Sequence, residues 1–269
     1  MDIPVRHPIS RASPVAGTNH GEQPSMLSSR FSRGASFFSA NSLSKRLPIK
    51  GWAAVMSDSA KKSQRAKRPG KHRSFQIWID GVGGYLVCPS KSVWIGQAIP
   101  RAGIDIPIKG DLRRRHACIE LHRGEHLISP AGRLKIDGIT ARNGVSPLVD
   151  GQELQFGECA RLKYKQPHPL SQTARLDFSS GNRTTPWSDA VLLMAQTLII
   201  GPSAQNHIEC PGWERTLILL REENGWVCRT SGEFEVDGQI CTDESPIRLD
   251  SIISGEDFSL TLEPVNKAI

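Results

Sequence analysis

The chain has 269 residues, 38% of them hydrophobic, and a formal net charge of +7. Residues 1–74 contain 14 Lys or Arg and three Asp or Glu, whereas residues 75–269 contain 20 Lys or Arg and 24 Asp or Glu. The positive charge therefore belongs to the N-terminal arm, and it does not indicate that the rest of the chain binds nucleic acid. No apolar run approaches the about 20 residues of a membrane-spanning helix and no secretory signal pattern is present, so we expect a cytoplasmic protein.

Residues 1–73 are rich in Ser, Arg, Lys, Pro and Gly and show no sustained hydrophobic period. This composition predicts a disordered basic arm. The run at 61–73, KKSQRAKRPGKHR, is of a kind that contacts nucleic acid or anionic membrane, although a solvated linker is the simpler interpretation. Met56 opens MSDSAKKSQ and is a plausible alternative translation start, in which case the first 55 residues are not part of the working protein.

From Ser74 the chain changes to short β-type runs separated by turn residues. Phe75–Ile79 and Tyr85–Cys88 flank the turn DGVGG and predict a hairpin. We expect a last run, Thr173–Phe178, to return and pair with the first. The runs between them are 92–96, 104–108, 115–122, 126–129, 135–139, 153–156 and 161–164. Many short strands without a helical period predict a β-sandwich over residues 74–178.

Residues 179–188, SSGNRTTPWS, have the composition of a linker, and the strand pattern begins again after them. The expected runs are 190–195, 197–201, 207–210, 216–221, 226–229, 234–237, 247–249 and 258–263. The second half also repeats the first at a separation of about 100 residues, since Asp137-Gly138 matches Asp237-Gly238. We therefore predict an all-β protein with two tandem antiparallel β-sandwiches of one fold, at 74–178 and 189–266.

The stretch Lys109–Leu121, KGDLRRRHACIEL, is the most distinctive in the chain. A glycine turn and three arginines precede His116, which lies on a predicted strand. Arginines at a loop tip beside a sheet commonly hold phosphate, because the guanidinium fork offers two parallel charge-assisted hydrogen bonds. The competing interpretation is a solvated basic turn.

These residues, taken together, resemble a forkhead-associated (FHA) domain, a β-sandwich that binds phosphothreonine peptides. The matching segments, in the family's order, are Val93–Gly96, Asp105–Ile108, Asp111–Ala117, Ile136–Gly138 and Pro147–Gly157. The resemblance covers about residues 74–178 and implies structural family positions at Gly96, Ala117, Gly138 and Gly157. The resemblance also implies that residues 189–266 are a divergent copy of this domain.

The resemblance also implies a phosphopeptide site whose residues are Gln97, Arg113, Arg114, Arg115, His116 and Gly132. Three of its positions depart from the family pattern: Gln97 stands where Arg is usual, Arg113 where Ser is usual, and AGRL at 131–134 where Asn-Gly-Thr is usual. In the family the histidine mainly braces the loop. Because side chains on a strand alternate, we expect only one of Arg114 and Arg115 to face the groove with Arg113.

The corresponding loop of the second half is Gly212-Trp213-Glu214-Arg215-Thr216, and nothing in it resembles a phosphate-binding site. Trp213 is either an exposed interaction anchor or, as is commoner for a single Trp in a turn, part of local packing. This half is expected to act by packing or surface shape.

No catalytic or metal-binding motif is present. The chain lacks G-x-S-x-G and H-E-x-x-H, and its six cysteines show no C-x-x-C spacing, so unpaired core thiols are expected. We therefore expect no enzymatic activity, no cofactor and no metal. The leading hypothesis is an interaction module for a phosphorylated or acidic protein segment. One alternative is a phospho-independent scaffold that uses intramolecular or homo-oligomeric contact between the sandwiches, and the other is an arm that anchors the protein on nucleic acid or a membrane.

Overall fold

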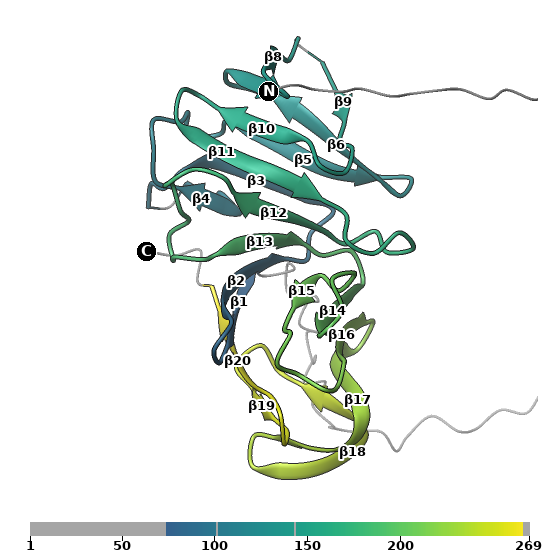
Figure 1. Cartoon of the computed structure of the whole chain (residues 1–269). Helices are drawn as coiled ribbons and strands as arrows, with labels where there is room; N and C mark the ends of the chain where they lie inside the picture. The colour runs from purple at the N-terminus through teal and green to yellow at the C-terminus, as the bar shows by residue number, and fades with distance from the viewer. Residues whose placement is uncertain (1–73, 101, 143, 266–269) are drawn as a thin grey trace, which may run out of the picture. The chain divides into compact units, whose positions relative to one another are not determined.

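The computed structural model describes residues 74–100, 102–142 and 144–265, and the predicted arm lies outside these ranges. Within them the chain is all β, as predicted, with one 15-stranded and one 5-stranded sheet and no helix (Figure 1). Accordingly, none of these residues forms a helix that could span a membrane.

All the runs predicted from alternation overlap observed strands. The strands are β1 (Phe75–Ile79), β2 (Gly83–Cys88), β3 (Ser92–Gln97), β4 (Ile106–Ile108), β5 (Ala117–His122), β6 (Glu125–Pro130), β7 (Leu134–Ile136), β8 (Ile139–Thr140), β9 (Ser146–Pro147), β10 (Glu153–Phe156), β11 (Ala160–Lys165), β12 (Ala174–Phe178), β13 (Ala190–Leu193), β14 (Thr197–Gly201), β15 (Ile208–Glu209), β16 (Leu217–Glu222), β17 (Gly225–Val236), β18 (Gln239–Ile247), β19 (Ile252–Ser254) and β20 (Ser259–Pro264). The sequence did not predict β9, β19 or most of β18.

A first core lies between the small sheet, in the order β4-β3-β5-β6-β9, and the part of the large sheet that runs β2-β13-β12-β11-β10-β7-β8. Side chains of β11 alternate between the two faces of the sheet: Leu162 and Tyr164 are buried in this core, while Arg161 and Lys163 are exposed. One face of the strand is therefore apolar and the other is solvated.

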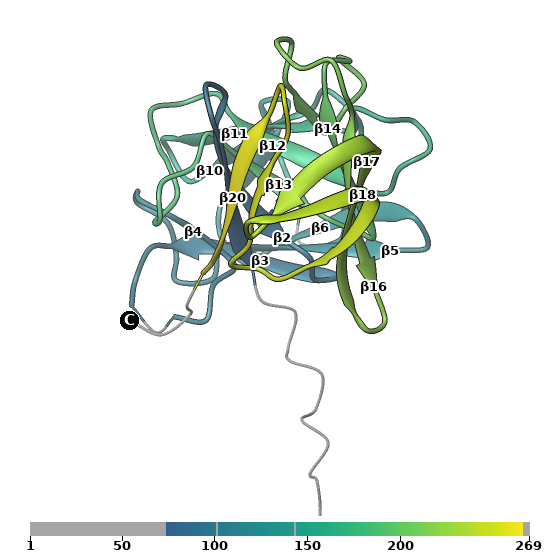
Figure 2. The same ribbon diagram turned by 90° about the horizontal axis from the view of Figure 1, so that it is seen from below.

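A second core is enclosed by β14 to β20 together with β1, β2 and β13. The long strand β17 allows this enclosure because its pairing with β18 shifts register between Arg229 and Glu233. Before the shift β17 pairs with β16, and after it Glu235 and Val236 pair with β19. Figure 2 shows the curvature of the β17–β18 pair.

The two cores share strands β2 and β13. Leu86 of β2 is buried in the first core and Val87 in the second, and β13 divides its side chains in the same way. The two strands pair in parallel with Tyr85 opposite Ala190, so each residue faces the one 105 positions later. This separation is also that of Gly96 and Gly201, which match each other in the sequence repeat.

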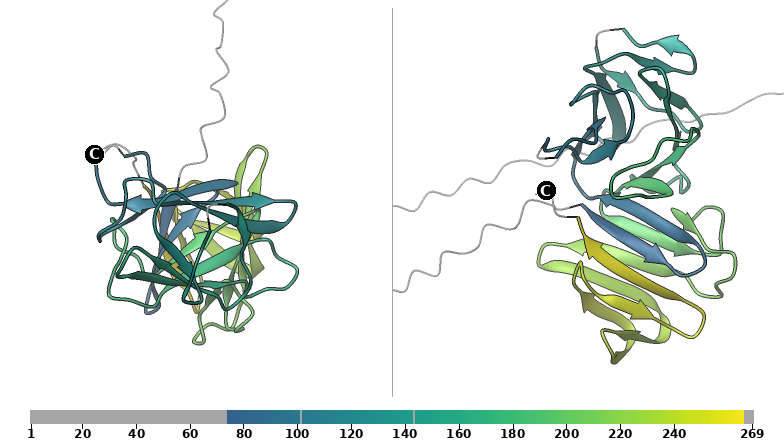
Figure 3. Two further views of the ribbon diagram at one scale, coloured as in Figure 1. Left: turned by 90° about the horizontal axis from the view of Figure 1, so that it is seen from above. Right: turned by 90° about the vertical axis from the view of Figure 1, so that its left-hand side faces the viewer.

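The hairpin of β1 and β2 consequently contributes more buried side chains to the second core than to the first. Strand β1 pairs with β20 near the end of the chain (Figure 3, right). The prediction that Thr173–Phe178 pairs with the first strand is wrong, because β12 lies between β11 and β13. Both β1 and β12 have the alternation of a strand, and alternation does not specify the partner.

The segment expected to be a linker, residues 179–188, is tied to β4. The backbone N–H groups of Lys109 and Thr185 donate to Arg183 O and Pro107 O at 3.0 and 2.9 Å, respectively. Thr184 and Ser188 are buried, with exposed fractions of 2% and 0%. The segment is thus part of the packed structure, and the two cores are not separated there.

The Asp-Gly pairs of the two halves form the same turn. Asp137 and Gly138 have φ angles of 49° and 78°, and Asp237 and Gly238 have 52° and 83°. Two successive positive φ values are typical of type I′ hairpin turns, which favour Asp-Gly. In each turn the aspartate Oδ1 accepts a backbone N–H, from Glu153 or from Ile252, at 2.9 Å. The sequence repeat therefore corresponds to repeated local structure.

Candidate functional site

The arginine-rich loop joins β4 to β5 and is fixed to the end of β3. The N–H of Gln97 donates to Arg113 O at 3.1 Å, and the N–H of His116 donates to Ile95 O at 2.8 Å. Gly96 lies so close to this loop that an added Cβ would be 2.0 Å from the carbonyl oxygen of Arg114. The glycine is therefore required because two backbone segments approach closely.

Replacing Gly96 with alanine is expected to lower the free energy of unfolding by more than about 3 kcal/mol, because a backbone group, which cannot rotate away, would have to move. Chemical denaturation of the full chain measures the effect. Gly181→Ala is the matched control, since nothing lies within 4 Å of its added Cβ and its φ is not positive. Equal denaturation midpoints for the two variants would contradict the steric argument.

His116 braces two loops from a buried position, with an exposed fraction of 3%. Its Nδ1 accepts the Arg113 N–H at 3.1 Å, so Nε2 carries the proton that is donated to Arg133 O at 2.8 Å. Its carbonyl oxygen accepts the N–H groups of Ala131 and Gly132, both at 2.8 Å. All of its hydrogen-bonding groups are thus engaged in holding the loops, which is a positioning role.

Gly132 is the second close approach at this end of the sheet. A Cβ on it would be 2.7 Å from atoms of the His116 ring, which also packs edge-on against Phe156. Gly157, at a φ of 62°, would similarly bring a Cβ within 2.7 Å of Asp111 O. Ala117 is buried at the start of β5, and Gly138 belongs to the turn between β7 and β8.

The three arginines of the loop are exposed and have different surroundings. Arg113 reaches the neighbouring loop, where its Nη1 donates to Ala131 O at 2.7 Å. Arg115 instead lies over the Trp94 ring, with its guanidinium 5.0 Å from the ring centre. Of the predicted site residues, the structure brings together Gln97, Arg113, His116 and Gly132 at the ends of β3, β5 and β6, and it directs Arg115 toward β3.

Arg133 was not predicted as part of this site. Its carbonyl oxygen accepts the hydrogen bond from the Nε2–H of His116, and its side chain forms an ion pair with Glu158. Both groups are exposed, so the pair contributes little to stability. It nevertheless places a second guanidinium on the loop contacted by Arg113. The only sequence signal was its position within the AGRL segment.

The equivalent loop of the second half is braced by an arginine. Arg215 Nη1 donates to Ser231 O and Glu233 O at 3.3 and 2.9 Å. These carbonyls lie 100 positions after those of Ala131 and Arg133, so Arg215 takes over the contacts that Arg113 and His116 make in the first half. Its guanidinium also pairs with Asp257 at 3.3 Å and with Glu256 at 3.5 Å.

Charge compensation therefore distinguishes the two loops. Two carboxylates face Arg215, whereas Arg113 forms no ion pair with any residue that the structure describes. Trp213 is 7% exposed and packs against Phe258 with the ring centres 5.2 Å apart, so the local-packing interpretation is confirmed. Only the first half presents an uncompensated guanidinium at this position.

The described residues contain no cluster of His, Cys, Asp or Glu that could hold a metal ion. The six cysteines, which all lie in the described ranges, form no disulfide, and Cys88, Cys118, Cys210 and Cys228 are buried. Comparison with models of protein families, with curated proteins and with solved structures finds no match to this chain.

Proposed function

We propose that this chain is a non-enzymatic interaction protein whose first half binds a phosphorylated or acidic protein segment at the loop end that carries Arg113. The observation that carries the proposal is the contrast between Arg113 and Arg215. Arg113 is exposed, is oriented by one hydrogen bond to Ala131 O, and lacks a carboxylate partner among the described residues. Such a guanidinium can donate to two oxygens of a phosphothreonine or carboxylate.

The proposal includes the FHA-like character of both halves. It is supported by the His116 brace between adjacent loops, by the close approaches at Gly96 and Gly132, and by the repeated Asp-Gly turns. In this view the second half is a divergent copy whose loop charge is already satisfied by its own carboxylates.

Binding of a phosphothreonine peptide library to the full chain tests the proposal. We expect selected peptides to bind at least about tenfold more weakly when unphosphorylated, and to lose a similar factor with Arg113→Ala, since hydrogen bonds to charged groups contribute about 1.5–3 kcal/mol. Arg161→Ala, an exposed arginine on β11, is the control and should bind like the wild type. Equal binding of both peptide forms, unaffected by Arg113→Ala, would refute phosphate recognition.

A phospho-independent scaffold is the second candidate, and the Arg113–Ala131 hydrogen bond itself favours it. The bond closes the two loops without a ligand, as Arg215 does in the second half. On this alternative, Gln97→Arg combined with Arg113→Ser restores the FHA pattern and creates phosphopeptide binding that the wild type lacks. Clear phospho-dependent binding by the wild type would exclude it. The arm hypothesis concerns residues outside the described ranges. Deleting residues 1–73 distinguishes it from the phosphopeptide and scaffold proposals.

A further inference from the structure

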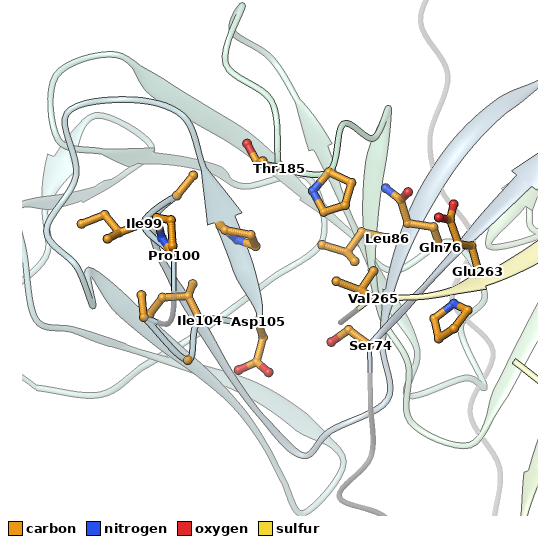
Figure 4. A pocket seen from close by; sticks show the side chains of 16 residues that line it. Ser74, Gln76, Leu86, Ile99, Pro100, Ile104, Asp105, Thr185, Glu263 and Val265 are labelled. Carbon is orange, nitrogen blue, oxygen red and sulfur yellow. The ribbon is translucent and has the colours of Figure 1, made fainter. Parts of the chain in front are cut away.

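Two hollows among the described residues differ in their chemistry. The larger, of about 450 Å³, is mainly apolar, with Ile104 on one side and Val265 on the other (Figure 4). The Asp105 carboxylate in its wall already accepts the Trp94 N–H at 2.9 Å. The smaller, which we call the junction hollow, has about 280 Å³ and is lined mainly by polar and charged side chains. Charged groups therefore decide what the junction hollow can bind.

Both halves of the chain build the junction hollow. The first half contributes residues of β11 and β12 and the turn at Asp150-Gly151. The second half contributes Ala204 and Asn206, which lie between β14 and β15, and Glu209 of β15. Ligand sites occur preferentially where structural units meet. A molecule bound in this hollow would contact both halves at once.

One wall of the junction hollow carries three basic side chains. Lys163 and Lys165 are two positions apart on β11, so they leave the same face of the sheet, and Arg175 is opposite Lys165 on β12. Asp177 compensates part of this charge, because it forms ion pairs with Lys165 at 2.7 Å and with Arg175. The side chain of Lys163 forms no ion pair or hydrogen bond with any residue that the structure describes. One ammonium group of this wall is therefore unpaired.

Two carboxylates line the same hollow. Glu209 is exposed and forms no ion pair within the described part of the chain. Asp150 accepts the Gln166 N–H at 2.8 Å through Oδ1, and it too lacks an ion pair with the described residues. The ammonium group of Lys163 is thus not within ion-pairing distance of either carboxylate, and unpaired charges of both signs remain in one hollow.

This arrangement selects against ligands of a single charge. A simple anion would be attracted by Lys163 and repelled by Glu209 and Asp150, and a simple cation would meet the reverse. A molecule that carries both charges can pair with Lys163 through one end and with Glu209 through the other.

We propose that the junction hollow binds a small zwitterionic molecule of about the size of a dipeptide. Its anionic group lies against Lys163 and its cationic group against Glu209, so that each unpaired side chain gains a partner of opposite charge. The volume of about 280 Å³ is near the lower end of ligand pockets, which suits a molecule of this size. The proposal does not depend on phosphate recognition at Arg113.

Three matched probes test the proposal: glycylglycine, N-acetylglycylglycine, which carries only the negative charge, and glycylglycinamide, which carries only the positive charge. Each is titrated into the ¹⁵N-labelled full chain while amide shifts are followed. We expect glycylglycine to shift the amides of Gly151, Ala204 and Asn206. Each singly charged analogue should bind at least about threefold more weakly, because it leaves one charge of the hollow unpaired.

Two variants remove one charge each. Lys163→Met should weaken glycylglycine binding about threefold and abolish its advantage over glycylglycinamide, which lacks the carboxylate. Glu209→Gln should likewise abolish the advantage of glycylglycine over N-acetylglycylglycine, which lacks the ammonium group. Lys91→Met and Glu125→Gln change exposed residues outside the hollow and are the matched controls.

Three outcomes would overturn the proposal: no saturable shift of the hollow's amides with glycylglycine, equal affinity for the three probes, or discrimination between them that persists in both Lys163→Met and Glu209→Gln. A dispersed spectrum of each variant shows that it is folded. Arg113→Ala should leave glycylglycine binding intact, so a failure of phosphopeptide binding leaves the result at the junction hollow interpretable on its own.

Discussion

A fragment comprising residues 74–178 is expected to be unfolded when it is produced without the rest of the chain. Strand β1 would lose its partner β20, and β2 would lose β13. Five side chains of this hairpin that lie in the second core would become exposed: Phe75, Ile77, Ile79, Tyr85 and Val87. At about 1.5–3 kcal/mol each, their exposure forfeits about 10 kcal/mol, which is comparable to the whole stability of a domain.

A fragment comprising residues 89–193 is the informative comparison. It omits the hairpin and keeps β3 to β13, so the first core loses only two buried side chains, Leu86 and Cys88, and the partly buried Val265. We expect this fragment to give a dispersed ¹⁵N–¹H spectrum and a cooperative denaturation curve, in contrast to residues 74–178. A folded 74–178 fragment beside an unfolded 89–193 fragment would contradict the shared-strand arrangement.

Local pattern predicted the strands correctly because side-chain alternation is a property of neighbouring residues. It did not predict the pairing, because β1 and β12 carry the same kind of pattern and differ only in distant contacts. A usable signal was present in Tyr85–Cys88 and Ala190–Met194, which are apolar without alternation. Continuous apolar runs indicate strands that are buried on both faces, and the strands in these runs serve both cores.

The site was predictable to the extent that it depends on adjacent residues. His116 and the glycines were identified because short stretches of adjacent residues around them resemble the FHA pattern. The roles of Arg133 and Arg215 were missed because both depend on other loops: Arg133 contacts His116 and Glu158, and Arg215 contacts Glu233 O and Asp257. Tertiary contacts of this kind decide whether a carboxylate pairs with the guanidinium of an arginine. The presence of the arginine in the sequence does not reveal such a pairing.

Acid should destabilise the protein well above the pH at which carboxylates titrate, because two histidines are buried as neutral groups. His126 and His207 have exposed fractions of 6% and 0%. Burial lowers the pKa of His126 from 6.5 to about 4, and burial with the nearby His168 lowers that of His207 to about 4. His126 Nδ1 bonds to Tyr164 OH at 3.0 Å, and His207 lies between Ile199 N–H and Ser171 Oγ, each at 2.9 Å.

Between pH 6.5 and 4 the unfolded chain takes up protons at both histidines and the folded chain does not. Their contribution is therefore complete above pH 6.5 and is lost as the pH falls toward 4. At about 1.4 kcal/mol per pKa unit, each histidine removes about 3 kcal/mol over this interval. The free energy of unfolding, measured by urea denaturation at several pH values, should fall accordingly.

His207→Gln separates this effect from general acid sensitivity. Glutamine offers a donor and an acceptor but does not titrate, so the fall between pH 6.5 and 4 should shrink by about half even if the variant is less stable at pH 7. Substitution of the exposed His122 with glutamine should leave the fall unchanged. A wild-type free energy of unfolding that stays constant over this interval would mean that neither buried histidine is kept neutral by the fold. Because His207 lies where the loop before β12 meets β14, its protonation weakens the junction between the two halves directly.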